Sequence, residues 1–256
     1  VGQPERQEPH EAAYDDPGDG VPPQSFLTRV ANSFYNNIVH ERRYLLLWDG
    51  LVATVLISVF ATLLGTALGA LVCYMRMSKW RLMNVPARLF ISLLRGVPML
   101  VLLMLIFYVV FASVNIDPLV VAIIAFGLNF AAYSAEIFRS GVESIDTGQT
   151  EAGLSIGFGR VATFVHIVLP QTVRRILPVY RGQFISLVKM TSIVGYIAVQ
   201  DLTKASDIIR SRTFDAFFPL ILVAALYFLI AWVLMLALDR LERVTDPHYR
   251  RARAAR

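Results

Sequence analysis

The sequence predicts an all-α protein that crosses a membrane five times, and three observations support this fold class. Of the 256 residues, 56% are hydrophobic and only 17% are charged, whereas soluble domains carry roughly 25% charged residues. Several uncharged stretches approach the ~20 residues needed to cross a bilayer. The lysines and arginines are concentrated in alternate loops between these stretches. A chain this apolar is not intrinsically disordered, and its single cysteine, Cys73, excludes an internal disulfide framework.

The predicted spans follow the apolar stretches in chain order. They are residues 50–75, about 87–111, 118–135, 183–199 and 216–238. The first and last contain no Asp, Glu, Lys or Arg. The fourth is the least regular, because Lys189 and a polar pair interrupt it. The alternative is a soluble protein with apolar core helices, but such helices need polar faces, and the first and last spans have none.

The distribution of basic residues predicts the orientation. With five spans, the loops at 76–88 and 139–181 lie on the same side as the C-terminal tail, and together they hold fifteen lysines and arginines. The opposite set, which includes the N-terminal segment and the 201–216 loop, holds seven. Positive charge is retained on the cytosolic side, so we expect the C-terminus inside and the N-terminus outside. This asymmetry accounts for much of the net charge of +5 without nucleic-acid binding.

The composition divides the chain into four parts. Residues 1–24 are acidic and rich in Pro and Gly, which is typical of a flexible linker. Residues 25–47 have apolar residues at helical spacing and predict an interfacial amphipathic helix, although the same face could instead pack on the bundle. Residues 48–241 form the transmembrane domain, and 242–256 form a basic cytosolic tail.

The connection between the third and fourth spans, about residues 143–175, is the most informative part of the chain. Long connections inside compact domains are usually functional. A short helix is expected near 147–158, and Gly157 and Gly159 can end it with a positive φ. Pro170 then marks a change of chain direction or the start of another helix. Such a helix on the cytosolic side is a surface that a soluble partner can bind.

The residues of this connection carry a family resemblance. Glu151-Ala152-Gly153, Gly157 and the Ile167-x-Leu169-Pro170 segment resemble the EAA loop of ATP-binding cassette (ABC) importer permeases. In that loop the pattern is Glu-Ala-Ala-x3-Gly-x9-Ile-x-Leu-Pro, and only Gly153 departs from it. Segments 95–98, 132–139 and 183–189 resemble the polar amino-acid branch of the family, and the resemblance extends from about residue 45 to residue 241.

The resemblance implies a type I ABC importer permease fold and an ATP-driven import function. The implied partners are two ATPase subunits, a second permease lobe and an extracytoplasmic substrate-binding protein, or such a domain fused upstream. Carried over by position, Glu151 contacts the ATPase, Ala152 and Gly153 permit close approach, and Gly157 forms the turn. Ile167, Leu169 and Pro170 complete the set of ATPase-coupling residues. Because glycine disfavours helix, the coupling helix is expected to be shorter or less rigid here.

The chain is expected to bind no cofactor and to have no catalytic site. No Walker A pattern occurs in it, so ATP and Mg would be bound by the partner ATPase subunit. The four histidines have no metal-ligand spacing to one another, and Cys73 is expected to serve packing. The resemblance also implies that the chain is a multi-pass protein of the prokaryotic cytoplasmic membrane.

Charged and polar residues within spans are candidates for the substrate pathway, because such residues are costly in lipid. They are Asn129, Tyr133, Glu136, Lys189, Thr191 and Ser192. Lys189 either meets a substrate carboxylate or pairs with Glu136 or with backbone carbonyls. Glu136 has Arg139 three residues on as a simpler partner, and Asn129 and Tyr133 have interhelical packing as the alternative.

Two further features of the spans leave alternatives open. Arg95 precedes a Gly96-Val97-Pro98 break and is expected to reach the cytosolic interface with its long side chain. Gly65 and Gly69 form a step of small residues at which another helix can approach closely, either in the same subunit or across a dimer. An ATP-independent channel or secondary transporter is the alternative function, although the loop would then be unnecessary, and an intramembrane enzyme is less favoured.

Overall fold

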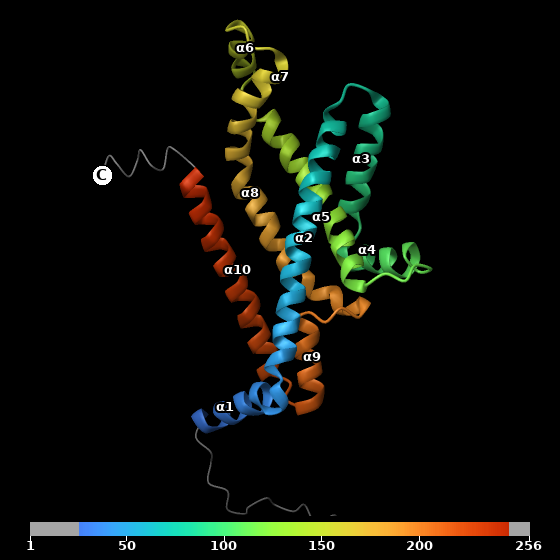
Figure 1. The fold of residues 1–256 in the computed structure, drawn as a ribbon, viewed down its shortest axis with the longest axis vertical. Coiled ribbons are helices and arrows are strands. Elements are labelled where there is room, and N and C mark those ends of the chain that lie inside the picture. Colours follow the sequence, from blue (N-terminus) through green and yellow to red (C-terminus); the bar gives the residue numbers. More distant parts are fainter. Residues whose placement is uncertain (1–25, 246–256) are drawn as a thin grey trace, which may run out of the picture.

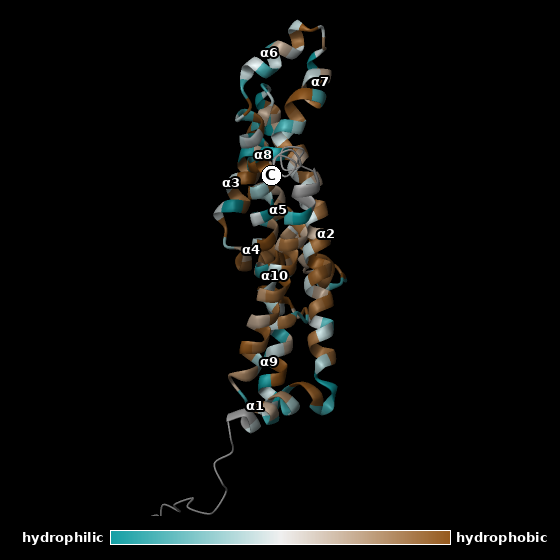
Figure 2. Ribbon diagram, turned by 90° about the vertical axis from the view of Figure 1, so that its left-hand side faces the viewer, coloured by the Kyte–Doolittle hydropathy of each residue, from teal (hydrophilic) through white to brown (hydrophobic). Residues whose placement is uncertain are grey.

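The computed structural model describes residues 26–245, and every regular element in that range is helical. The predicted linker at 1–24 and most of the predicted tail lie outside the described residues. The long helices α2 and α10 run along an elongated bundle that has α1 at one end and α6 and α7 at the other (Figure 1). Hydrophobic residues predominate in the middle of the bundle (Figure 2). The elements are α1 (Phe26–Phe34), α2 (Tyr44–Met77), α3 (Arg81–Gly96), α4 (Met99–Leu105), α5 (Pro118–Glu143), α6 (Thr147–Ser155), α7 (Arg160–Thr163), α8 (Leu169–Met190), α9 (Leu202–Thr213) and α10 (Phe218–Thr245).

Three helices, α2, α5 and α10, are long and apolar enough to span a membrane on their own. Two sharply bent helix pairs bring the number of spans to five when each pair counts as one. The membrane-bundle prediction is therefore confirmed. The second predicted span, about 87–111, consists of two helices, and the chain bends by 111° between them.

The bend in the second span has a local cause. α3 ends at Gly96, and Val97 adopts an extended conformation with φ −98° and ψ 133°. A residue before proline is pushed toward this region, and Pro98 cannot donate the hydrogen bond that would continue the helix. α4 then starts at Met99 and continues into a π-helical turn at Ile106–Val110. The Gly-Val-Pro break seen in the sequence is thus a change of direction.

The predicted fourth span, 183–199, is also not one helix. α8 ends at Met190, a 3₁₀ segment covers Thr191–Ile197, and Ala198 has a left-handed φ of 63°. Asp201 then caps α9 by accepting hydrogen bonds from the amides of Thr203 and Lys204 at 3.1 and 2.9 Å. The Tyr227 hydroxyl of α10 donates to the same buried carboxylate at 2.9 Å. This cap fixes the start of α9 against α10.

The central packing unit of the bundle is the α2–α5 pair. A Cβ built on Gly65 would lie 2.8 Å from the carbonyl oxygen of Gly127, and one built on Gly69 would lie 2.8 Å from the Cβ of Ser134. The step of small residues therefore lets α5 of the same chain approach α2. Of the two alternatives, an approach within the subunit or across a dimer, the structure shows the first. Phe126 and Phe130 of α5 are fully buried in the adjoining core with Leu103. Close backbone approach is the usual way that helices gain contact in lipid.

The N-terminal segment is not the single helix expected over 25–47. α1 ends at Phe34, and Glu41 and Arg42 have positive φ values of 53° and 54° before α2 begins at Tyr44. The segment is attached to the α9–α10 turn, where buried Asn37 donates to Asp215 at 2.9 Å. Burial raises the pKa of Asp215, but hydrogen bonds from the Phe218 amide and from Asn37 outweigh it, so the pKa is lowered overall.

Candidate functional site

The connection between α5 and α8 folds as a helical hairpin. Asp146 caps α6 by accepting a hydrogen bond from the Gly148 amide at 2.6 Å. At the other end, the amide of Gly157 donates to Leu154 at 3.0 Å and that of Phe158 to Gly153 at 3.1 Å. This pair of bonds is a Schellman motif, which needs a left-handed residue, and Gly157 has φ +93°. Gly157 therefore forms the predicted turn at the end of the helix. Gly159 does not adopt a positive φ, since its φ is −68°.

Gly153, the residue that departs from the family pattern, lies inside the hairpin. It is buried, and a Cβ on it would lie 2.6 Å from Cγ2 of Thr163 and 2.8 Å from Cδ1 of Ile167. The absent side chain therefore lets α6 lie directly on α7 and the π-helical turn Phe164–Val168. α6 continues two residues past Gly153 to Ser155, three residues short of the end expected at 158. The close approach that Gly153 permits in the structure is internal to the loop.

Restoring the family's alanine at this position is expected to destabilise the hairpin. Gly153→Ala gains up to about 1 kcal/mol of helix propensity, but overpacking against the buried, branched Thr163 typically costs 1 to 3 kcal/mol. We expect faster proteolytic cleavage within 147–168. The double variant Gly153→Ala/Thr163→Ser, which removes the obstructing methyl group, should restore resistance. Equal cleavage of wild type and Gly153→Ala would contradict this packing argument.

The outer surface of the hairpin combines one carboxylate with several apolar side chains. Glu151 and Ala152 are exposed, and the Glu151 carboxylate has no hydrogen-bond or ion-pair partner among residues 26–245. Ile156 is 70% exposed and Val161 is 77% exposed. We call the exposed residues Glu151, Leu154, Ile156, Phe158 and Val161 the hairpin surface. Its apolar members are not among the candidate contacts predicted from the sequence. Hydrophobic residues in a connection outside the spans can nevertheless indicate a binding surface.

The base of the hairpin is joined to the membrane helices by several contacts. Gln171 of α8 donates to Gln149 of α6 at 3.1 Å, and the Arg175 guanidinium donates to the Ser144 carbonyl oxygen. A Cβ on Gly141 of α5 would overlap the Ile176 side chain of α8. These contacts join the hairpin directly to α5 and α8.

Ile167, Leu169 and Pro170 lie where the hairpin continues into α8. Ile167 contacts the Gly153 position, as described above, and Pro170 stands in the first turn of α8, in agreement with the predicted helix start. The preceding turn is π-helical, with the Leu169 amide donating to the Phe164 carbonyl. A proline has no amide to offer the fourth residue before it, and a π-turn is a common local adjustment.

Two of the α5 pathway candidates contact the bend in the second span. Asn129, which is buried, donates from Nδ2 to the Leu94 carbonyl at 3.1 Å. The Arg95 guanidinium lies over the Tyr133 ring at 5.0 Å from its centroid, so its interaction is cation–π. The Arg95 side chain thus contacts α5, and the Asn129 amide provides a hydrogen-bond donor for a carbonyl near the end of α3.

The remaining candidates are not gathered at one site. Glu136 pairs with Arg139 at 2.8 Å and with Arg76 at 3.8 Å, so the predicted pairing with Arg139 is confirmed and one with Lys189 is absent. Thr191 is fully buried, and its hydroxyl donates to the Val188 carbonyl at 2.7 Å. Ser192 is half-buried. The Lys189 side chain is exposed and has no partner among the described residues.

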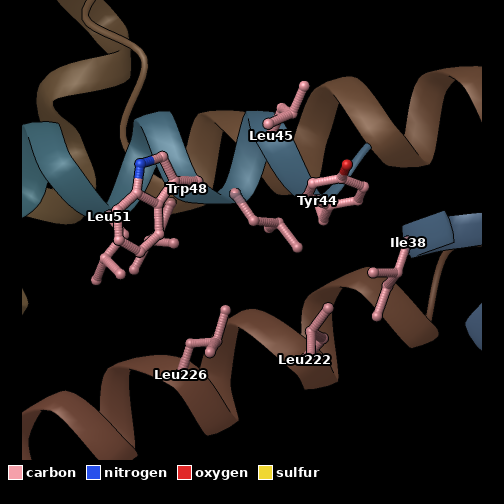
Figure 3. A pocket seen from close by; sticks show the side chains of 9 residues that line it. Ile38, Tyr44, Leu45, Trp48, Leu51, Leu222 and Leu226 are labelled. Carbon is pink, nitrogen blue, oxygen red and sulfur yellow. The ribbon is translucent and has the colours of Figure 1, made fainter. Parts of the chain in front are cut away.

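An apolar pocket of about 550 Å³ lies at the end of the molecule opposite the hairpin. Leu222 and Leu226 of α10 face Tyr44 and Trp48 of α2 across it (Figure 3). All of its lining side chains are hydrophobic or aromatic, so it does not suit a polar solute. None of the pathway candidates lines it.

These features define a class: a multi-pass, all-helical membrane protein in which a rigid helical hairpin joins two of the spans. The comparisons with known proteins specify it further. The family model described as "Binding-protein-dependent transport system inner membrane component" matches residues 61–251. The chain belongs to this family.

Three relatives from Bacillus subtilis (strain 168) illustrate the similarity. The probable amino-acid ABC transporter permease protein YckA is 36% identical over 76% of this chain and 86% of its own length. The L-cystine transport system permease protein TcyB is 34% identical over 82% and 91%. The probable glutamine ABC transporter permease protein GlnP is 36% identical over 77% and 92%.

Solved structures agree with this assignment. A crystal structure of an amino acid ABC transporter with histidines has a chain that is 32% identical to this one and superimposes with a TM-score of 0.72, covering 85% of this chain and 97% of its own. The MetNI methionine ABC transporter shares the fold at 20% identity and a TM-score of 0.62. The protein is therefore a permease subunit of an ABC importer, embedded in the membrane as a transport component.

Proposed function

We propose that this permease carries polar amino acids inward across the cytoplasmic membrane of a prokaryote, in a complex with two ATP-binding cassette ATPase subunits. A second permease lobe, identical or homologous, completes the pathway, since five spans are too few to enclose one. A substrate-binding protein, or such a domain fused upstream, delivers the substrate from outside. ATP and Mg are bound by the ATPase subunits, and this chain hydrolyses nothing. The relatives named for amino acids, cystine and glutamine support the substrate class.

The observation that carries the proposal is the hairpin surface. It lies at the extreme end of the molecule (Figure 1). Glu151 is exposed there without a side-chain partner among the described residues, and Ile156 and Val161 of the same hairpin are exposed as well. A charged group next to a small apolar patch is a common composition for a protein-binding surface. Because the hairpin is packed firmly on α8, closure of the ATPase dimer pulls α5 and α8 and changes the side to which the pathway opens.

The distribution of positive charge along the bundle supports the proposed orientation. The hairpin, the α2–α3 turn and the last turns of α10 belong to the end of the bundle that is rich in lysine and arginine, and α1 lies at the other end (Figure 1). Positive charge on the cytosolic side supports a hairpin that faces the ATPase in the cell. Within the pathway, Lys189 is the best-supported contact for a substrate carboxylate, because its ammonium group has no partner among the described residues.

Glu151→Ala is expected to weaken ATPase binding without affecting membrane insertion. The carboxylate has no hydrogen-bond or ion-pair partner among the described side chains, so its loss should leave the described fold intact. In a complex, loss of a hydrogen bond to a charged group costs about 1.5 to 3 kcal/mol. Co-purification of tagged permease with ATPase subunits measures the effect, with Asp49→Ala, an exposed carboxylate at the opposite end of the bundle, as the matched control. Full co-purification and full transport in Glu151→Ala would refute the assigned contact.

Uptake by reconstituted vesicles separates the importer from a channel or secondary transporter. Vesicles with permease, ATPase subunits and binding protein should accumulate labelled amino acid only when ATP is present. Transport sustained by a proton or sodium gradient in the absence of the ATPase would contradict the proposal, since the hairpin would then have no partner to couple to.

A further inference from the structure

A cleft lined by cations lies at the turn between α2 and α3, separate from the hairpin surface and from the pathway candidates. Its volume is about 370 Å³. Its lining residues are Ser78, Lys79, Arg81, Asn84, Val85 and Arg88. The turn lies toward the same end of the bundle as α6, but α6 extends farther from the middle of the molecule (Figure 1).

The turn that carries the cations is fixed by its own hydrogen bonds. Asn84 donates from Nδ2 to the Arg76 carbonyl and, at 3.3 Å, to the Ser78 carbonyl. The Trp80 amide donates to the Ser78 hydroxyl at 3.2 Å. A side chain from α3 thus closes the end of α2, so the cations project from a preformed surface. Preorganisation of this kind lowers the entropic cost of binding a ligand.

The positive charge of the cleft is not neutralised within the described chain. The side chains of Lys79, Arg81 and Arg88 form no ion pair or hydrogen bond with any side chain that the structure describes, and no carboxylate lines the cleft. Nearby Arg76 differs, because it pairs with Glu136. Three like charges around one concave surface create a positive potential that favours an anion.

Apolar side chains continue from the cleft along α3. Leu82, Val85 and Leu89 recur at helical spacing and are 86%, 58% and 58% exposed, and Trp80 is 74% exposed. An exposed apolar stripe that meets a tryptophan and several cations is the pattern of a membrane interface. A small soluble anion would satisfy the cations but leave the stripe uncovered, whereas a phospholipid satisfies both.

We propose that this cleft binds the phosphate headgroup of an anionic phospholipid, with the acyl chains lying along Leu82, Val85 and Leu89. The site is independent of the transported substrate. Basic pockets at membrane helices bind anionic headgroups through the same attraction. The lipid anchors the α2–α3 turn at the membrane surface.

Trp80 provides a direct probe of the site. The chain has three tryptophans, and Trp48 and Trp232 are exposed, so W48F/W232F leaves Trp80 as the only emitter. Full-length W48F/W232F protein is reconstituted in vesicles that contain either brominated phosphatidylglycerol or brominated phosphatidylcholine, and quenching of Trp80 is titrated. We expect a relative binding constant about tenfold higher for phosphatidylglycerol.

Charge variants and a competing anion test whether the cations of the cleft cause the preference for the anionic lipid. K79Q/R81Q/R88Q should bring the two lipids to nearly equal quenching, whereas R160Q/R174Q/R240Q, which removes three exposed cations outside the cleft, should retain the preference. Inorganic phosphate at millimolar concentration should not displace the lipid. Equal quenching of the parent protein by both lipids would overturn the proposal. Displacement by inorganic phosphate, or shielding of Trp80 from both lipids by added ATPase subunits, would overturn it as well.

Discussion

Replacing Ile156 by aspartate is expected to abolish stable binding of the ATPase subunits while the permease remains folded. Ile156 follows the last turn of α6 and is 70% exposed, so a carboxylate there is solvated in the free chain. In the complex the loss of a buried isoleucine costs about 1.5 to 3 kcal/mol. Burying an unpaired charge adds several kcal/mol more. An affinity loss of at least about a hundredfold follows.

Measurement of this effect needs a control for an added charge alone. Phe217→Asp introduces the same charge at another exposed apolar position, on the α9–α10 turn at the far end of the bundle. Pull-down of ATPase subunits with tagged permease, together with permease-stimulated ATP hydrolysis, should fail for Ile156→Asp and succeed for Phe217→Asp. If both variants retained the ATPase equally, the hairpin surface would not be the docking site.

Much of the fold was predictable because it depends on local sequence patterns. The uncharged stretches at 50–75 and 216–238 became α2 and α10, since a span requires continuous apolar length. Gly65 and Gly69 identified a close helix contact from their spacing alone. Gly157 was predictable as a turn residue, because a helix that ends in a Schellman motif needs a left-handed position. In each case the determining residues are neighbours in the chain.

The parts that could not be predicted depend on contacts between distant residues. Asn129 and Tyr133 were interpreted as pathway residues or packing residues, but their partners, Leu94 and Arg95, lie on another helix. The role of Gly153 depends on Thr163, ten positions later. Ala198 adopts a left-handed φ although it is not glycine, so the residue types in this segment do not predict the change of chain direction before α9. Tertiary packing determines all of these features.

Gly65→Val is expected to have the largest effect on the fold itself. Even the first carbon of a side chain at Gly65 would lie 2.8 Å from the Gly127 carbonyl oxygen and 2.8 Å from the Phe130 Cβ. The carbonyl belongs to a helix backbone and cannot rotate away, so α2 and α5 must separate. Overpacking of this kind costs about 3 kcal/mol, and the separation also opens contacts around Phe130.

Gly182→Val is the matched control, because Gly182 also lies in a long helix and a Cβ there has no neighbour within 4 Å. Both substitutions change helix propensity alike, so their difference isolates the packing term. In detergent, Gly65→Val should unfold at a clearly lower temperature than wild type, and Gly182→Val should unfold close to it. Gly65→Ala should lie between them. Identical melting of Gly65→Val and Gly182→Val would mean that α2 and α5 are not in close contact, and the path by which hairpin movement reaches the rest of the bundle would have to run through α8 alone.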